Sequence, residues 1–314
     1  MQSKNIYSPA FPVTVEKDGK ICYTEKNIFR RNNMSRLRLM SNNQWKNDRN
    51  HTKWEERGLD CSAAVREAGF AEVYALTAPD VVGLQEVSPL MIDELMGNLQ
   101  RMGLPYALLW GRDTPVLYRT DKMELVDSWH SLYPDECPGF DGIFNNSRTK
   151  SFTIAVFRTK EDGALFLFTT THLWWKSSDP ASGYYQHGSD EARAYQIGLV
   201  IEKIGEFQKK YGCPAVIVGD FNADCDSLAM KYALNHGFLD AHDIAVDYAE
   251  DTNGWHPCGN DGFAPYQPRE FRHSIDHIMV RNAPDGFVKR FDRYIADSYL
   301  PLSDHFPLWI DVEF

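Results

Sequence analysis

Apolar positions along the chain follow two different spacings. Short runs of mostly β-branched apolar residues, bounded by polar residues, Gly or Pro, are typical of buried strands. Longer segments with apolar residues three and four apart are typical of amphipathic helices. The predicted strands are 36–41, 81–84, 116–119, 151–157, 165–171, 216–218, 274–280 and 308–314, and the predicted helices are 62–76, 91–102 and 191–209. Since hairpin-like strand pairs occur between helices, this order predicts mixed sheets covered by helices, an α/β layered fold.

The first 35 residues stand apart from this pattern. Two short apolar segments, Val13–Val15 and Ile21–Tyr23, flank Lys17–Lys20, whose Asp-Gly pair is typical of a hairpin turn. We expect residues 1–35 to form an edge hairpin or a flexible extension. Because the chain has no repeat, low-complexity tract or Gly/Ser linker, we expect residues 36–314 to form a single domain.

Several predicted strands carry polar residues at their carboxyl ends. The run Val216–Gly219 is followed by Asp220 and Asn222, which are two apart and so point the same way from an extended chain. The other polar residues at strand ends or in short loops between strands are Asn43, Glu86, His172, Asp276, Asp304 and His305. If the strand ends meet at one cleft, these side chains form a cluster of carboxylates, amides and imidazoles. Carboxylate oxygens suit Mg²⁺ or Mn²⁺ rather than zinc, and such an ion can polarise a phosphoryl oxygen.

Each of these residues also has a structural interpretation. Asp220 and Asn222 could cap the helix that follows them. Glu86 could be a surface glutamate, and His172 could be a packed histidine. The recurrence of reactive residue types at successive strand ends favours the chemical interpretation over these alternatives.

Taken together, the motifs resemble the endonuclease/exonuclease/phosphatase superfamily, which includes deoxyribonuclease I, exonuclease III-type repair nucleases and mRNA deadenylases. The matching segments occur in the order of that family and are Leu39–Asn43, Val82–Val87, Thr171–Leu173, Gly219–Asn222, Ser274–Ile278 and Leu302–Leu308. The resemblance implies a four-layer α/β/β/α sandwich of two packed mixed β-sheets flanked by helices. It also implies metal-dependent hydrolysis of a phosphate ester by direct attack of an activated water.

The resemblance gives the acidic and amide residues their expected roles. Glu86 would be the principal Mg²⁺ ligand, with Asn43 beside it and Asp304 supporting the metal region. Asp220 would orient or deprotonate the attacking water, and Asn222 would hold this water and the phosphate oxygens.

The resemblance also implies a role for two histidines. His305 would hydrogen-bond the scissile phosphate, and Asp276 would orient its ring. His172 would bind the phosphate from the other side. An aspartate that accepts the other ring proton of His305 would fix its tautomer and favour the imidazolium form.

The asparagine at the end of the first strand of the domain has an equally polar neighbour. Alternation along the strand and the motif of the family both select Asn43 rather than Asn42. In the exonuclease III-type branch an acidic residue follows two positions later, where this chain has Trp45, which weakens an apurinic endonuclease interpretation. Trp45, Trp54 and Arg57 instead resemble a bacterial branch of the superfamily.

Three further residues are candidates for substrate binding. Arg148 could contact a phosphate or be a solvated loop arginine, and Arg193 could contact a phosphate or form a salt bridge under the active site. Trp255 lies in segment 255–272, which with segment 174–188 carries Trp, Tyr, His and Gly. Such loops could stack on a base or a sugar, or pack on themselves.

Charge narrows the choice of substrate. A formal net charge of −11 repels long polyanions, and the chain has no stripe rich in Lys and Arg. We therefore expect a phosphodiester that is single-stranded nucleic acid, a nucleotide or another small molecule. The alternative is a phosphomonoester of a sugar, inositol or nucleotide, and a third hypothesis is a degenerate binding protein.

The cysteines and the apolar runs bear on the cellular compartment of the protein. The six cysteines show neither a CxxC pair nor a zinc spacing, which favours reduced thiols. The first residues have no signal-peptide core, and no apolar run is long enough to span a bilayer. We expect a cytoplasmic protein that does not enter membranes, and we infer no protein partner.

Overall fold

The computed structural model describes residues 14–15, 21–22, 35–49, 51–249 and 274–314. The chain divides into two units, Met1–Asn33 and Met34–Phe314. In the first unit, β1 (Thr14–Val15) pairs with β2 (Ile21–Cys22) in antiparallel fashion. The two strands of the predicted hairpin are therefore present, while its predicted turn lies outside the described residues.

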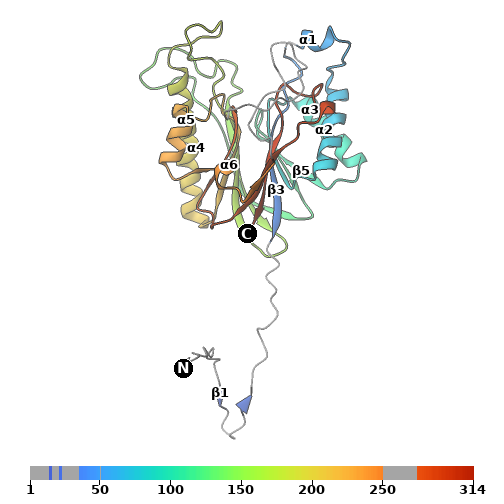
Figure 1. Cartoon of the computed structure of the whole chain (residues 1–314), viewed down its shortest axis with the longest axis vertical. Helices are drawn as coiled ribbons and strands as arrows, with labels where there is room; N and C mark the ends of the chain where they lie inside the picture. The colour runs from blue at the N-terminus through green and yellow to red at the C-terminus, as the bar shows by residue number, and fades with distance from the viewer. Residues whose placement is uncertain (1–13, 16–20, 23–34, 50, 250–273) are drawn as a thin grey trace, which may run out of the picture. The chain divides into compact units, whose positions relative to one another are not determined.

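The second unit contains the other described helices and strands (Figure 1). In chain order they are β3 (Arg36–Asn43), α1 (Thr52–Glu55), α2 (Ala63–Thr77), β4 (Val81–Gln85), α3 (Pro89–Arg101), β5 (Tyr106–Leu109), β6 (Val116–Arg119), β7 (Met123–Leu132), β8 (Ser151–Thr159), β9 (Leu165–His172), α4 (Ser189–Tyr211), β10 (Ala215–Asp220), α5 (Leu228–Asn235), β11 (Leu239–Asp240), α6 (Ala241–Ile244), β12 (Asp247–Tyr248), β13 (Asp276–Arg281), β14 (Val288–Arg293), the 3₁₀ helix η1 (Asp297–Tyr299) and β15 (Leu308–Glu313).

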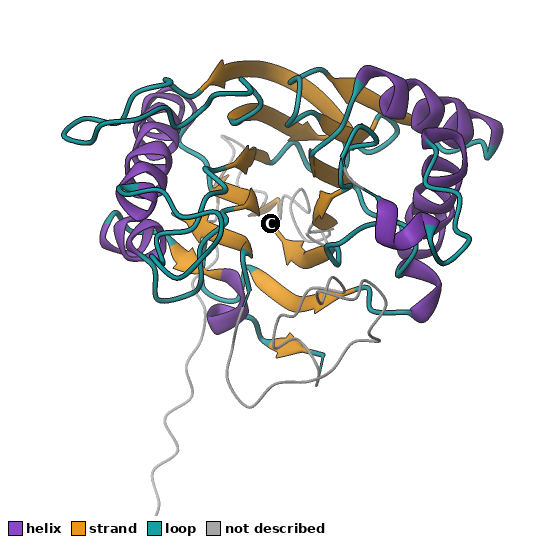
Figure 2. Ribbon diagram, turned by 90° about the horizontal axis from the view of Figure 1, so that it is seen from above, coloured by secondary structure: helices purple, strands orange, loops and turns teal. Residues whose placement is uncertain are grey.

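The strands of the second unit form two mixed sheets. One has the order β12-β14-β15-β3-β4-β6-β5 and the other the order β11-β13-β10-β9-β8-β7. Each contains a parallel pair at its centre, β3 with β4 and β9 with β10, among antiparallel neighbours. Figure 2 shows the strands in the middle and the long helices on the two outer sides. The predicted α/β/β/α sandwich is confirmed.

Alternating side chains along the central strands separate three layers of core. Leu39 of β3 packs between the two sheets, whereas the next residue, Met40, packs on the outer face beneath α2 and α3. In β10, Val216 faces the core between the sheets, and Ile217 faces α4. Strands buried on both faces are therefore continuous apolar runs in the sequence, which is why they were predicted.

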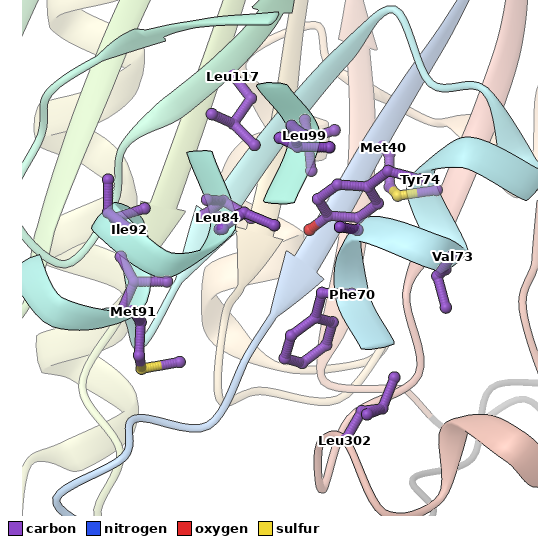
Figure 3. Close-up of a cluster of buried hydrophobic side chains, with 14 of the residues drawn as sticks. Met40, Phe70, Val73, Tyr74, Leu84, Met91, Ile92, Leu99, Leu117 and Leu302 are labelled. Carbon is purple, nitrogen blue, oxygen red and sulfur yellow. The ribbon is translucent and has the colours of Figure 1, made fainter. Parts of the chain in front are cut away.

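The helices are built to cover the outer faces. In α3, the Ser88 side chain caps the helix by accepting a hydrogen bond from Met91 N, and Pro89 occupies the first turn. Figure 3 shows Phe70 of α2 and Leu99 of α3 in the outer core cluster. Truncating a fully buried leucine such as Leu99 to alanine typically costs about 2–5 kcal/mol. This packing holds the strand ends in fixed positions.

The strand directions bring several chain ends to one edge of the sandwich. The carboxyl ends of parallel β3 and β4 lie together, as do those of parallel β9 and β10. Antiparallel β13 begins at the same edge, because Asp276 is opposite Asp220. Antiparallel β8 also begins there, since Ser151 is opposite His172. In Figure 1 this edge is at the top, where the chain leaves β3 towards α1.

Two further predictions can be compared with the described residues. Within these residues, none of the helices is both apolar enough and long enough to pass through a lipid bilayer. Among the described residues, Cys61, Cys137 and Cys213 are buried free thiols.

Candidate active site

Asp220, the last residue of β10, is the centre of a buried polar cluster and is only 2% exposed. Its Oδ1 accepts a hydrogen bond from Asn222 N at 2.8 Å, and its Oδ2 accepts one from Asn43 Nδ2 at 3.0 Å. His172 Nε2 lies 3.4 Å from the same Oδ2. Each oxygen of the Asp220 carboxylate therefore accepts a hydrogen bond. Through these contacts Asp220 connects residues of the two sheets.

The backbone around Asp220 explains the local sequence. A Cβ at Gly219 would lie 2.0 Å from Thr171 O of the neighbouring strand, so that only glycine allows this close approach. Asn222 has a φ of 50°, a left-handed conformation that asparagine tolerates better than most residues. Glu86 has a similar φ of 55° immediately after β4. Such conformations are costly, and they cluster at functional sites.

His305 is paired with an aspartate and surrounded by other carboxylates. Its Nδ1 lies 2.8 Å from Asp276 Oδ2, and its Nε2 lies 3.8 Å from Asp304 Oδ1 and 3.9 Å from Asp220 Oδ2. Burial would lower the pKa of His305, but Asp276, Asp304 and Asp220 raise it well above its usual value. The ring is therefore an imidazolium at neutral pH, with one N–H towards Asp276 and the other towards the centre of the site.

The loop that carries His305 is tied to the rest of the site. Ser303 Oγ donates to Asn43 O at 2.7 Å and accepts from His305 N at 3.1 Å. The buried guanidinium of Arg66 donates from Nε to Leu302 O at 2.8 Å. The loop position is thus coupled to both β3 and α2.

Glu86 and His172 come from different sheets and approach each other at the site. Glu86 Oε1 lies 3.7 Å from His172 Nε2. Burial raises the pKa of Glu86, but its neighbours His172, Lys150 and Arg49 outweigh this effect and lower the pKa to about 2. Glu86 is therefore an anion under all ordinary conditions, as a metal ligand must be.

Asp113, Lys150 and Arg49 also belong to the cluster, and sequence reasoning missed them. Asp113 Oδ2 lies 2.9 Å from His172 Nδ1, Lys150 Nζ contacts His172 Nε2, and Arg49 Nε donates to Glu86 Oε2 at 3.1 Å. Burial lowers the pKa of Lys150, although Glu86, Asp220 and Asp113 act in the opposite direction. Lys150 immediately precedes β8, so a search of the starts of antiparallel strands would have found it.

The donor set fits a divalent cation. Ligand atoms of Glu86, His172 and Asp220 lie within 4.8 Å of one another, and so do those of Asp220, Asp276 and His305. Burial and the carboxylates of Glu86 and Asp220 raise the pKa of Asp304 to about 7, although His305 lowers it. Among the described residues, the buried Oδ1 of Asp304 has no hydrogen-bond partner. Crowded carboxylate oxygens of this kind suit a hard cation such as Mg²⁺ or Mn²⁺.

Comparison with known families agrees with this geometry. Residues 49–305 match the Endonuclease/Exonuclease/phosphatase family. The chain belongs to this family. The resemblance predicted from the motifs is therefore confirmed, and it places the chain among phosphoester hydrolases.

Solved structures of the family have the same fold. One is an endonuclease/exonuclease/phosphatase family protein from Bacteroides thetaiotaomicron, with 22% identity, coverage of 90% of this chain and 98% of that chain, and a TM-score of 0.68. A mannosyl-6-phosphatase from Bacteroides thetaiotaomicron VPI-5482 is 22% identical, covers 88% of this chain and 100% of its own length, and has a TM-score of 0.66. TDP2 from D. rerio, in complex with a single-strand DNA product, is 19% identical over 88% of this chain and 98% of that chain, with a TM-score of 0.56. At these identities the likeness shows the fold alone. No curated protein sequence matches the chain.

The two asparagines at the end of β3 point in opposite directions. Asn43 points into the site, towards Asp220, as the family motif implies. Asn42 lies beneath the helices, where it accepts from Tyr74 Oη and donates to Tyr299 Oη, both at 2.7 Å. Strand β3 extends through Asn43 rather than ending at residue 41, which is what carries the alternation this far.

The three candidates for substrate binding lie in different surroundings. Arg193 is buried, and its guanidinium donates to Trp174 O at 3.1 Å and to Lys176 O at 2.7 Å and also pairs with Asp190. These contacts support the structural alternative for Arg193, because they hold the loop after β9. Arg148 is exposed, with a φ of 52°. Trp255 lies outside the described residues.

Proposed function

We propose that the protein is a hydrolase that depends on Mg²⁺ or Mn²⁺ and cleaves a phosphate ester by direct attack of water. The observation that carries this proposal is the position of Asp220, which lies close to Glu86 and His172 on one side and to Asp276 and His305 on the other. Because Asp220 lies near both Glu86 and His305, it can accept a proton from a water and remain close to the cation. Among the described residues, the side chains close to Asp220 include amides and imidazoles, in agreement with attack by water.

The acidic side chains of the site are suited to hold the cation. Glu86 and Asp304 would hold it, with Asn43 and Asp220 beside them. When bound, the cation would supply charge neutralisation and polarise a phosphoryl oxygen. Glu86 is suited to this role because it remains ionised far below neutral pH. Asp304 would lose its remaining proton at neutral pH once a cation offsets the neighbouring carboxylates.

The other side chains of the site position the attacking water and the phosphate. Asp220 would accept a proton from the attacking water, while Asn222 N–H and the Asn43 amide hold its carboxylate in place. His305, fixed by Asp276, would donate from Nε2 to a phosphate oxygen. Phosphoryl transfer needs mainly positioning and stabilisation of charge, and this arrangement supplies both.

The proposed substrate is a phosphodiester, either single-stranded nucleic acid, a nucleotide or another small molecule. The net charge of −11 disfavours long duplexes, and the fold is shared with TDP2 in complex with a single-strand DNA product. A phosphomonoester is the second candidate. Lys150 and Arg49 add positive charge beside His172 and Glu86, which suits a dianionic phosphate, and a mannosyl-6-phosphatase shares the fold.

Hydrolysis of two chromogenic esters would test the proposal. Bis-p-nitrophenyl phosphate and p-nitrophenyl phosphate should be compared with Mg²⁺, with Mn²⁺ and with EDTA. We expect metal-dependent turnover, and a loss of about 10²–10⁴-fold in Asp220→Asn, which removes the proton acceptor. Asp127→Asn is the matched control, because Asp127 pairs with Lys210 and Tyr211 at the surface. Turnover that persists in EDTA or in Asp220→Asn would overturn the proposal.

A panel of natural esters would then define the substrate. It should contain single-stranded DNA, poly(A) RNA, dinucleotide cofactors, and sugar and inositol phosphates. Cleavage of an oligonucleotide that is lost in Asp220→Asn would establish a nuclease. Turnover of phosphomonoesters alone would replace the phosphodiester by the second candidate.

A further inference from the structure

Arg49 reaches the candidate metal ligand Glu86 from a surface turn. Its backbone N–H donates to Lys46 O at 3.0 Å, and its Nε donates to Glu86 Oε2 at 3.1 Å. The Arg49 side chain is 39% exposed, whereas that of Glu86 is 15% exposed. Arg49 therefore stands at the solvent side of the site, with its guanidinium directed inward.

The two cationic side chains near Glu86 differ in their freedom to move. Lys150 is 1% exposed and contacts His172, so that it is held inside the site. Arg49 is exposed, and its ion pair with Glu86 is of the kind that stabilises by about 0–1 kcal/mol. Arg49 can leave Glu86 at little cost, and Lys150 cannot move without disturbing the core.

A divalent cation bound by Glu86 would displace Arg49 from the Glu86 carboxylate. The carboxylate oxygen that accepts from Arg49 Nε is one of only two on Glu86, and like charges at this distance repel. The released guanidinium would lie beside the place where the substrate phosphate binds. Its planar fork of N–H groups matches the oxygens of a phosphate.

We propose that Arg49 is a substrate-binding residue that exchanges partners. It pairs with Glu86 before the divalent cation binds, and with non-bridging oxygens of the substrate phosphate afterwards. This inference rests on the proposed function, since it takes a phosphate ester as the substrate. It assigns a role to a loop residue that no sequence motif marked.

Calorimetric titration of Mn²⁺ in the absence of substrate tests the first half. Wild type should be compared with Arg49→Gln and with Lys46→Gln, which removes one positive charge from the same turn but whose partner is Asp48. We expect Arg49→Gln to bind Mn²⁺ about two- to fivefold more tightly, because the cation no longer competes with an ion pair. Lys46→Gln should leave the dissociation constant within twofold.

Binding of inorganic phosphate to the Mn²⁺-loaded protein tests the second half. We expect Arg49→Gln to weaken phosphate binding about tenfold or more, as the loss of a charge-assisted hydrogen bond does. Arg49→Lys should lie in between, because it keeps the charge but lacks the planar fork. With a turned-over ester, KM should rise in Arg49→Gln more than kcat falls.

The outcomes separate this inference from the proposed function. An unchanged Mn²⁺ dissociation constant in Arg49→Gln would overturn the exchange of partners, and an unchanged phosphate dissociation constant would overturn substrate binding. Both constants are measured without turnover. A wild-type protein that hydrolyses no ester would therefore defeat the proposed function, while the two constants would still decide the role of Arg49.

Discussion

The site contains two histidine–aspartate pairs that look alike and differ in charge. His172 Nδ1 lies 2.9 Å from Asp113 Oδ2, and His305 Nδ1 lies 2.8 Å from Asp276 Oδ2. Both histidines are buried. The difference lies at the second ring nitrogen. His172 Nε2 contacts Lys150 Nζ as well as facing Asp220 and Glu86, whereas His305 Nε2 faces Asp220 and Asp304 and lies 3.4 Å from Asn43 Nδ2.

These surroundings set the protonation of each ring. A lysine ammonium has no lone pair, so Lys150 donates and His172 Nε2 must accept. The proton of His172 then lies on Nδ1 and is donated to Asp113, which leaves the ring neutral. His305 carries protons on both nitrogens, because the nearby carboxylates raise its pKa. The two pairs thus share a geometry, but the neighbours of each ring make His172 neutral and His305 cationic.

The largest expected effect is the unequal cost of replacing the two histidines. His305→Gln removes an N–H donor with full positive charge, and we expect kcat/KM to fall about a hundred- to a thousandfold. His172→Gln removes a neutral ring and leaves Lys150 in place, so we expect a loss of about tenfold. The measurement is kcat/KM with bis-p-nitrophenyl phosphate at saturating Mg²⁺.

Two conditions make this comparison sharp. His236→Gln is the control, because His236 is exposed just after α5 and its Nδ1 contacts Tyr232 O. Thermal unfolding should show that all three variants are folded. Equal losses in His305→Gln and His172→Gln would mean that the two pairs do the same work, and would contradict the assigned charges.

Sequence reasoning found most of this site because of where the residues stand on strands. Glu86, Asp220 and His172 follow or end buried apolar strands, and such ends are visible in the pattern. Lys150 immediately precedes β8, an antiparallel strand that begins at the same edge of the sandwich. A residue before a strand does not follow an apolar run, so the pattern did not indicate it. Asp113 lies in the loop after β5, a strand that the pattern did not predict. The protonation assigned to His172 depends on these two missed residues.

Two of the strands that sequence reasoning missed, β7 and β14, have a related cause. Strand β7 is at the edge of its sheet and is half exposed, and its pairing with β8 shifts register between Leu125 and Asp127. Strand β14 shifts register in the same way between Val288 and Arg290. A bulge reverses the face on which the next side chain lies, so the period of two is broken within each strand. Central strands have no such interruption in their apolar runs.

The second prediction concerns the cation on the His172 side. In Lys150→Met an apolar side chain of similar length replaces a buried ammonium. We expect kcat/KM to fall about ten- to a hundredfold, as the loss of a charged hydrogen-bond donor does. The loss should be larger for p-nitrophenyl phosphate, a dianion, than for the monoanionic diester. Kinetics with both esters, with the surface variant Lys203→Met as control, would measure it.

The Lys150 variant also tests the comparison directly. Without the ammonium, His172 Nε2 faces Glu86 and Asp220, much as His305 Nε2 faces its carboxylates. We expect His172 to take up a second proton, which nitrogen NMR shifts of the ring would report. A ring that stays neutral would show that Lys150 is not what separates the two pairs.

The smallest expected effect is a shift in pH dependence. Asp276→Asn keeps a hydrogen-bond acceptor for His305 Nδ1 but removes the charge that raises the pKa of His305. Since the active form of His305 is the protonated one, activity is present below its pKa and is lost as pH rises through it. Lowering that pKa should move the alkaline limb of kcat/KM towards lower pH by about one to three units.

Asp113→Asn makes the matching change at the other pair and should leave the alkaline limb where it is. The asparagine oxygen still accepts from His172 Nδ1, and the change does not alter the contact of His305 with Asp276. Profiles of kcat/KM against pH for wild type and the two variants, with NMR titration of the imidazole C–H signals, would separate the pairs. If Asp113→Asn moved the alkaline limb as far as Asp276→Asn does, His172 would be a cation in the working enzyme, and the contact with Lys150 would have to break during catalysis.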